Sequence, residues 1–300
     1  MNAPFSRTGP LMELSSYPDW ARQLVEDCAA DRARVTQHVL FQRMRDATLS
    51  YPIMRYFLIG VWPVIEQFPQ YMAFNLLKVR YGRHPGEDLA RTWLIRNLRV
   101  EQHHADYWVD WAEASDVSRD ALIAGLDDPA TLALSHWCWR TCEREALAIS
   151  MAATHYAIEG ATGDWSNLVC STDTYAQTFP EADRKKATRW LRQHAQYDDT
   201  HPWEALESTD DMEMLCLLTK EALLGQETRR YYHAQNSISF ERIYDALQDK
   251  EVAVVLARCL KEGYRRKMGI DVDIDDDELQ VNINTTFYLA FPGWFVDEKK

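Results

Sequence analysis

Glycine is scarce in this chain, and its scarcity argues against a fold rich in strands. Eleven of the 300 residues are glycine, which is about half of the ~7% found in average proteins. Sheets and barrels need many tight turns, and tight turns favour glycine. The composition therefore favours helices joined by few tight turns.

Basic charge and long apolar runs are also missing. The chain has 33 Lys and Arg against 46 Asp and Glu, a net charge of −13. This balance argues against nucleic acid and against an anionic membrane surface as partners. No apolar run reaches the ~18 residues of a transmembrane helix. Met1-Asn-Ala-Pro4 is not followed by the basic region and apolar run of a signal peptide, so we expect none. We expect no membrane span and a cytoplasmic protein.

Cysteine is infrequent, and its spacing does not suggest a zinc ribbon. The six cysteines lack paired short spacings, so we expect reduced, buried thiols of the cytoplasm. Cys138 and Cys142 lie one helical turn apart and are expected in the core. Eleven tryptophans and fourteen tyrosines indicate that this core is large.

The spacing of apolar residues predicts a succession of helices. An acidic connection at 271–278 and a strand or extended tail at 280–291 follow them. We expect residues 1–207 to form a helical core and 208–300 to add C-terminal helices and a tail to the same domain. The expected helices cover 18–28, 31–47, 52–79, 87–114, 130–163, 180–207, 210–234 and 240–267.

Three side chains of the helix expected over 180–207 have the spacing of metal ligands. On one helix, Asp198 and His201 lie about 40° and about −20° around the axis from His194. Neutral imidazole and carboxylate together suit iron, manganese or zinc. The alternative is a helix end that carries two surface histidines.

Glu101 and His104 form a second candidate pair, on the helix expected over 87–114. They are three residues apart and share a face, whereas His103 faces away, about 200° from Glu101. Di-iron carboxylate bundles use this Glu-x-x-His pair as ligands. Such a pair is also common on solvated helix faces.

Glu66 and Glu159 are single acids on two further helices. Glu66 is the only acid in an apolar helix, and a buried carboxylate needs a partner, so we expect either a ligand or a hydrogen-bonded structural acid. Glu159 precedes Gly160, and this glycine would let a helix, a metal or a substrate approach the backbone. His155 shares the face of Glu159 and is expected to line the cavity.

Seven oxygen and nitrogen donors on four helices suit two ions better than one, in the manner of carboxylate bundles. The set contains no thiolate, which disfavours structural zinc. Its members are Glu66, Glu101, His104, Glu159, His194, Asp198 and His201.

Four longer motifs resemble the UndA-type family of non-haem iron fatty-acid decarboxylases. They are LMELSSYP at 11–18, GRHPGED at 82–88, YAIEGATG at 156–163 and HAQYDDTHPWEALE at 194–207. The resemblance covers about 10–207. It implies the all-α, haem-oxygenase-like helical bundle that this family of di-iron oxidases shares with TenA and PqqC.

The resemblance also implies a reaction and a ligand set. A medium-chain fatty acid, such as dodecanoic acid, would be decarboxylated to a 1-alkene with O2 as co-substrate, by hydrogen abstraction at Cβ. Two Fe(II) ions per chain and an external electron donor would be required. The first iron, and catalysis, would depend on Glu101, His104, Glu159 and His194. The second iron would be held by Glu66, Asp198 and His201, with one glutamate bridging.

The apolar residues near these ligands are tunnel candidates for the alkyl chain, although each also fits a plain core. They are Trp62, Phe68, Met72, Trp108, Ile158 and Trp190. Three other functions stay open: an oxidase of the same scaffold that acts on an amino acid or amine, a metal-free TenA-like hydrolase that uses a cysteine, and a non-catalytic carrier of iron or fatty acid. The sequence leaves the oligomeric state open.

Overall fold

The computed structural model describes residues 7–126, 129–197, 200–207 and 212–226, and within these ranges it contains helices and no strand. The prediction of an all-α fold is confirmed there. The chain divides into two compact units, Met1–Arg230 and Tyr231–Lys300, and everything below concerns the first. The helix expected over 240–267, the acidic connection at 271–278 and the extended tail at 280–291 lie outside the described residues.

The helices vary from single turns to a segment of 28 residues. The α-helices are α1 (Asp19–Thr36), α2 (Val39–Arg45), α3 (Tyr51–Lys78), α4 (Pro85–Val100), α5 (His104–Ala114), α6 (Arg119–Ala124), α7 (Pro129–Arg144), α8 (Leu147–Ser150), α9 (Gly160–Cys170), α10 (Arg184–Ala187), α11 (Arg189–Tyr197), α12 (His201–Leu206) and α13 (Met212–Gln226). Shorter 3₁₀ turns are η1 (Leu14–Ser16), η2 (Glu101–His103) and η4 (Ala176–Thr178), and η3 (Met151–Glu159) is a π-helix.

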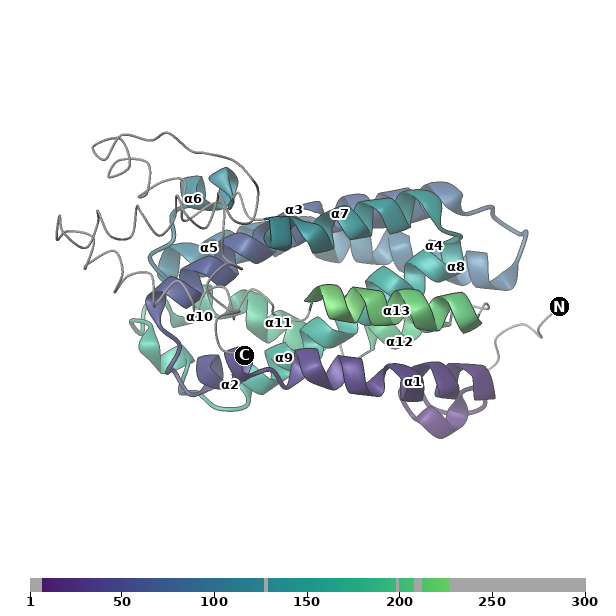
Figure 1. The fold of residues 1–300 in the computed structure, drawn as a ribbon, viewed down its shortest axis with the longest axis horizontal. Coiled ribbons are helices and arrows are strands. Elements are labelled where there is room, and N and C mark those ends of the chain that lie inside the picture. Colours follow the sequence, from purple (N-terminus) through teal and green to yellow (C-terminus); the bar gives the residue numbers. More distant parts are fainter. Residues whose placement is uncertain (1–6, 127–128, 198–199, 208–211, 227–300) are drawn as a thin grey trace, which may run out of the picture. The chain divides into compact units, whose positions relative to one another are not determined.

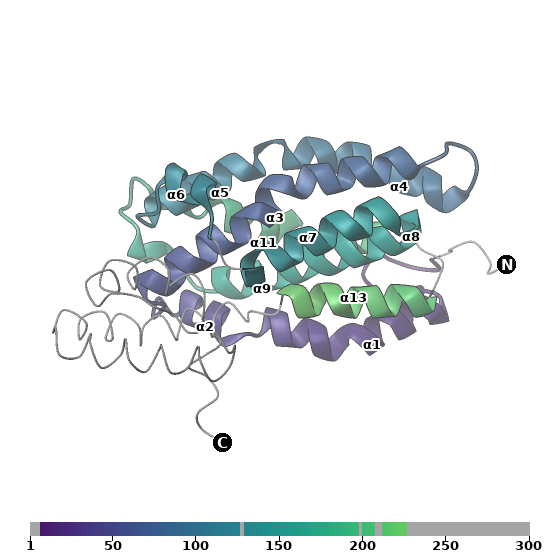
Figure 2. The same ribbon diagram turned by 45° about the horizontal axis from the view of Figure 1, so that its top comes forward.

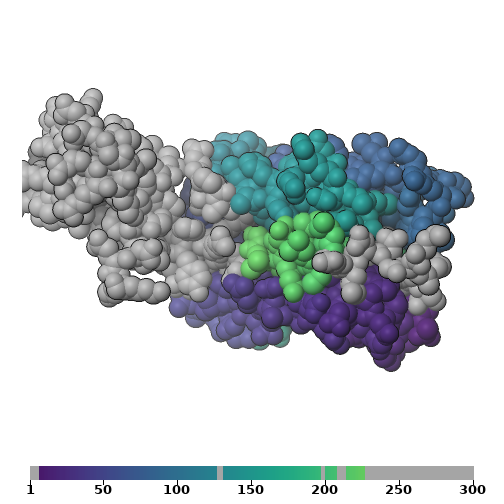
Figure 3. All heavy atoms as spheres, turned by 45° about the vertical axis from the view of Figure 1, so that its right-hand side comes forward, coloured from purple at the N-terminus to yellow at the C-terminus, as the bar shows by residue number. Residues whose placement is uncertain are grey.

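The helices pack in pairs that are distant in the sequence. α13 lies along α1, α3 along α7, and α9 along α11 (Figures 1 and 2). α13 also contacts η3, and it forms the green strip of the surface in Figure 3. α13 therefore packs into the helical body of the first unit.

Local sequence explains where several helices begin. α3 and α4 each carry proline in the first turn. The backbone N–H groups of the first turn have no acceptor inside the helix, so a proline there costs no helical hydrogen bond. The Nδ1 atom of His84 accepts a hydrogen bond from the Gly86 amide, and Ser118 Oγ accepts one from the Ala121 amide at the start of α6.

Within the described part of the chain, no helix has the length and apolar character needed to cross a bilayer.

Four of the expected helices are interrupted. The segment at 31–47 divides between α1 and α2, and η2 separates α4 from α5 at Glu101. The segment at 130–163 becomes α7, α8, the π-helix η3 and α9, and that at 180–207 becomes α10, α11 and α12. Apolar periodicity is similar on both sides of a short interruption, so spacing alone does not reveal it. Single π-turns often lie at functional sites.

A cluster of buried tryptophans forms the core next to the candidate site. Trp190 is 1% exposed and stacks on Trp165 at 5.5 Å between ring centroids. The Trp108 ring meets Trp190 edge-on at 4.7 Å. Such aromatic pairs are rigid and bury large areas, so they hold α11 firmly against α5 and α9. Cys138 and Cys142 are fully buried, as predicted.

Candidate metal centre

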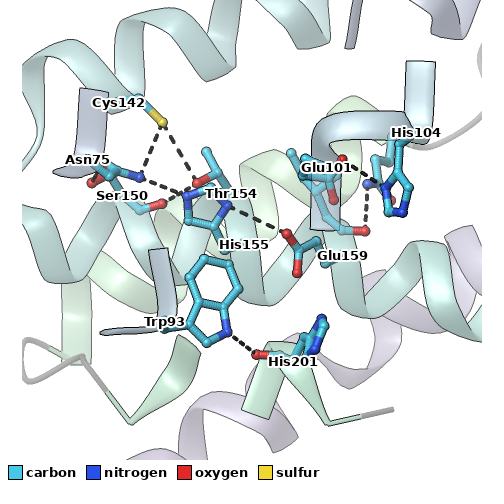
Figure 4. Close-up of polar contacts among 12 residues, drawn as sticks. Asn75, Trp93, Glu101, His104, Cys142, Ser150, Thr154, His155, Glu159 and His201 are labelled. Atoms are coloured by element: carbon cyan, nitrogen blue, oxygen red, sulfur yellow. Dashed lines mark hydrogen bonds and ion pairs between the residues drawn. The ribbon is translucent and has the colours of Figure 1, made fainter. Parts of the chain in front are cut away.

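A pocket in the helical body brings together four of the seven predicted ligands. Glu101, His104, Glu159 and His194 all line it. They come from η2, α5, η3 and α11, respectively. Figure 4 shows Glu159 between His155 and the pair formed by Glu101 and His104. The rest of the lining is mostly apolar: Val35, Phe41, Phe57, Val61, Val64, Ile65, Phe68, Leu134, Ile158, Trp165 and Trp190, with Thr162 and Gln226 as further polar members.

Glu101 and His104 contact each other directly, as their spacing predicted. His104 Nδ1 and Glu101 Oε2 are 2.8 Å apart, and the two side chains are 8% and 10% exposed. The 3₁₀ turn η2 keeps residues i and i+3 on one side. His103, predicted to face away, has a side chain that is 54% exposed.

His194 is held in the form that binds metal. Its Nδ1 donates to the carbonyl oxygen of Trp190 at 2.8 Å, because a carbonyl can only accept. The other ring nitrogen, Nε2, therefore carries the lone pair when the ring is neutral. The ring stacks on Trp190 at 3.7 Å and lies 4.6 Å from the His104 ring. Burial, and then the positive charge that His104 would carry, hold the pKa of His194 well below its ordinary value.

Glu159 ends the π-helix and is 6% exposed. Gly160 follows it, and the side chain of Arg32 lies in the space that a side chain at residue 160 would occupy. Arg32 Nη2 donates to the Gly160 carbonyl at 3.0 Å, and Arg32 Nε pairs with Asp164 at 2.8 Å. A Cβ at position 160 would lie 2.9 Å from Arg32 Nη1. The close approach predicted at this glycine is thus made by a guanidinium group that ties α1 to α9.

Glu66 does not join the cluster. The side chain is exposed and does not line the pocket, so the expectation of a buried acid was wrong. On α3 the pocket-facing stripe is Val61, Val64, Ile65 and Phe68. Residue 66 is about 100° around the helix from residue 65 and about 200° from residue 64. The apolar run therefore has an outward face, and Glu66 lies on it.

His194 and His201 do not share one continuous helix. α11 ends at Tyr197, and His201 is the first residue of α12, so the predicted same-face geometry of these two histidines was wrong. His201 is half-buried outside the pocket lining, and its carbonyl accepts from Trp93 Nε1 at 3.0 Å. Burial and then the charge of Arg96 lower the pKa of His201. Asp198 lies outside the described residues.

The tunnel candidates divide evenly. Phe68, Ile158 and Trp190 line the pocket. Trp62, Met72 and Trp108 do not, and the last two are fully buried core residues. His155 also lies outside the lining, completely buried beyond Glu159, which corrects its expected place in the cavity wall.

Besides several apolar residues, the sequence analysis missed two polar residues of the pocket lining. Thr162 and Gln226 line it, and Gln226 Nε2 donates to the Ile158 carbonyl at 3.2 Å. Gln226 is on α13, beyond the part of the chain that the motifs cover, so no motif could indicate it. Thr162 lies within the motif at 156–163, three residues after Glu159, and that helical spacing was the available signal.

The donor set fits an oxygen-activating metal in its chemistry. Two carboxylates and two imidazoles suit iron or manganese, and no cysteine is among the residues lining the pocket. In the described part of the chain, no three His, Cys, Asp or Glu side chains are grouped so that they could hold an ion as they stand. Metal binding by these four side chains therefore requires them to move closer together than they lie in this structure.

Comparison with known proteins extends the result. No family model matches the chain, and no curated protein matches it. A solved TenA homologue from Pseudomonas syringae pv. tomato is 54% identical, over 75% of this chain and 96% of its own length, with a TM-score of 0.72. A TenA homologue from P. horikoshii is 11% identical over 72% of this chain and 97% of its own, with a TM-score of 0.57.

A third solved structure with the same fold is not described as a TenA homologue. It is a domain of unknown function with a haem-oxygenase-like fold from Shewanella denitrificans, 10% identical over 75% of this chain and 95% of its own, with a TM-score of 0.57. The two distant matches show the fold, and the identity with the Pseudomonas protein shows the family. The chain belongs to the family of TenA homologues with a haem-oxygenase-like helical fold.

Proposed function

We propose that this chain is a non-haem iron oxidase that converts a medium-chain fatty acid into a 1-alkene and carbon dioxide. The observation that supports this proposal is the pocket itself, in which two carboxylates and two imidazoles meet an otherwise mostly apolar wall. A pocket of this kind suits a metal together with a long apolar substrate. The four motifs that resemble the UndA-type decarboxylases point to the same chemistry.

Each group of side chains has a role in this proposal. Glu101, His104, Glu159 and His194 would hold the first iron, and His201 with Asp198 would contribute to a second. Iron, when bound, supplies the reduction of dioxygen and the oxidation of the substrate at Cβ. The apolar wall sequesters the alkyl chain, and each buried CH₂ contributes about 0.8 kcal/mol. The same wall excludes water from the reacting carbon.

The reaction balances with one additional reductant. A fatty acid loses two electrons and two protons as the bond between C1 and Cα breaks, which leaves carbon dioxide and the 1-alkene. Reduction of dioxygen to two waters takes four electrons and four protons. An external donor must therefore supply two electrons, and solvent two protons, for each turnover.

The test is anaerobic loading with Fe(II), followed by exposure to oxygen with a panel of fatty acids and amines. We expect 1-undecene in the headspace from dodecanoic acid, and none from the His194→Ala variant. Oxygen consumption with amines alone would favour an amine oxidase of the same scaffold. Iron-loaded protein that consumes no oxygen with any substrate would reject the proposal and favour a carrier.

Asp198 tests the second iron separately. We expect Asp198→Ala to bind one iron per chain and to lose turnover, because the first four ligands remain. Metal analysis by mass spectrometry gives the ratio. Two irons per chain in this variant would exclude Asp198 as a ligand.

A further inference from the structure

A chain of buried polar groups lies beyond Glu159, on the side away from Glu101 and His104 (Figure 4). Asn75, Ser150 and His155 are each 0% exposed. Lys78 Nζ is 3.1 Å and Ser150 Oγ 2.6 Å from Asn75 Oδ1. Asn75 Nδ2 is 3.0 Å from His155 Nε2. Lys78 is half-buried at the end of this chain, and hydrogen-bonded networks in a buried environment fix the orientation of their members.

The direction of each hydrogen bond follows from Lys78. An ammonium group can only donate, so the atom of Asn75 beside it is the carbonyl oxygen. The amide NH₂ of Asn75 must then donate to His155 Nε2, which acts as an acceptor. A neutral His155 therefore carries its proton on Nδ1.

The proton on Nδ1 faces the metal pocket. His155 Nδ1 is 3.9 Å from Glu159 Oε1, and in the described part of the chain it makes no hydrogen bond of usual length. The ring is held between Phe68 and Trp93, at 5.5 and 4.9 Å between centroids. These contacts keep the ring from turning, so the donor stays directed at the carboxylate.

We propose that His155 is a positioning residue for Glu159, with Asn75 and Lys78 fixing the tautomer that presents Nδ1–H to the carboxylate. The inference rests on the proposed function, because it takes Glu159 as a metal ligand. Ligating carboxylates are commonly oriented by such hydrogen bonds, and loss of one typically lowers metal affinity 10- to 100-fold. His155 would thus decide how Glu159 can bind without itself touching the metal.

The first test uses the metal-free protein. Nitrogen NMR of ¹⁵N-histidine-labelled protein distinguishes a protonated from an unprotonated ring nitrogen. We expect Nδ1 of His155 to be protonated in the wild type. Asn75→Asp places an acceptor at Nε2 and should move the proton there. A wild-type His155 protonated on Nε2 would overturn the proposal.

The second test measures the affinity for Co(II), a spectroscopic substitute for iron, by competition with a chelator. We expect His155→Phe, which preserves the ring packing, and Asn75→Asp to weaken binding at least 10-fold and to shift the visible Co(II) absorption. Thr154→Val is the matched control, because the Thr154 hydroxyl donates to the Ser150 carbonyl and lies 3.8 Å from Cys142 Sγ. Its affinity should stay within twofold.

Three results separate the outcomes, with folding checked by near-ultraviolet circular dichroism. A folded His155→Phe protein with unchanged affinity and absorption overturns the positioning role. Equal losses in Thr154→Val would also overturn it, since they would indicate general loosening of the core. A wild type that binds no Co(II) would reject the proposed function and this role with it, while the NMR result would still report the tautomer.

Discussion

At the residue scale, two adjacent histidines differ sharply in their surroundings. The side chain of His104 is 8% exposed and bonds to Glu101, whereas that of His103 is 54% exposed. The two residues share local sequence, local charge and nearly the same backbone position. Any difference between their substitutions therefore reports on the pocket and not on helix propensity.

We expect His104→Ala to weaken Co(II) or Fe(II) binding at least 10-fold, because it removes one of four donors and leaves Glu101 without its bond partner. His103→Ala should leave affinity within twofold. Metal titration of both proteins measures the difference. Equal effects, or a larger effect at residue 103, would remove His104 from the ligand set.

A buried histidine also links stability to pH. The pKa of His155 is lowered to about 3 by burial and then by Lys78, against ~6.5 in the unfolded chain. The unfolded state therefore binds the proton first as pH falls below ~6.5. The contribution of His155 to the free energy of unfolding is therefore complete above ~6.5. It falls by about 1.4 kcal/mol per pH unit between ~6.5 and about 3.

Chemical unfolding of the metal-free protein at pH 7, 6 and 5 measures this slope. We expect His155→Gln to reduce it by about 1.4 kcal/mol per pH unit below ~6, and His103→Ala to leave it unchanged. His194 adds to the slope in the same direction, since its pKa is also lowered. A slope that His155→Gln does not change would show that His155 is not buried and neutral in the folded protein.

At the scale of elements, the end of η3 is fastened from outside by α1. Arg32 bonds to the Gly160 carbonyl and to Asp164, both on α9. Gly160 immediately follows Glu159, so the same contact fixes the segment that carries a candidate ligand. The absence of a side chain at residue 160 is what leaves room for the guanidinium group.

A double-mutant cycle tests this contact. Gly160→Ala should destabilise the wild type, because the new Cβ would lie 2.9 Å from Arg32 Nη1. In an Arg32→Ala background the same substitution should stabilise by up to about 1 kcal/mol, since alanine is the better helix former. Unfolding free energies should give a coupling of about 1–3 kcal/mol. Simple additivity would show that Arg32 does not occupy the space at Gly160.

At the scale of the whole molecule, a bound metal would join elements that are far apart in the sequence. Its four proposed ligands lie on η2, α5, η3 and α11. A ligand that binds only the folded state stabilises it by about 2.7 kcal/mol at 100 times its dissociation constant. Metal binding and global stability should therefore change together.

We expect anaerobic loading with Fe(II) or Co(II) to raise the Tm by about 5 °C. Removal of the metal with a chelator should reverse the increase. His194→Ala should show no increase, while His103→Ala should match the wild type. Calorimetry measures the Tm of the loaded wild type, the chelator-treated wild type and the two loaded variants. A wild-type Tm that is insensitive to both metals would contradict a metal centre in this pocket.

The sequence by itself determined what depends on short distances along the chain. Scarce glycine and apolar spacing indicated helices, and the three-residue spacing of Glu101 and His104 placed them together across a single turn. The four motifs pointed to a fold that the comparisons confirm. These features could be predicted because local backbone geometry decides them.

Only the tertiary structure decided which acids and imidazoles meet. Glu66 faces outward because the neighbouring stripe of α3 packs inward, and His201 leaves the helical register of His194 because α11 ends at Tyr197. Asn75 and His155 are eighty residues apart, and no spacing rule could pair them. Each of these outcomes depends on how helices pack against one another, and packing is a property of surfaces from the whole chain.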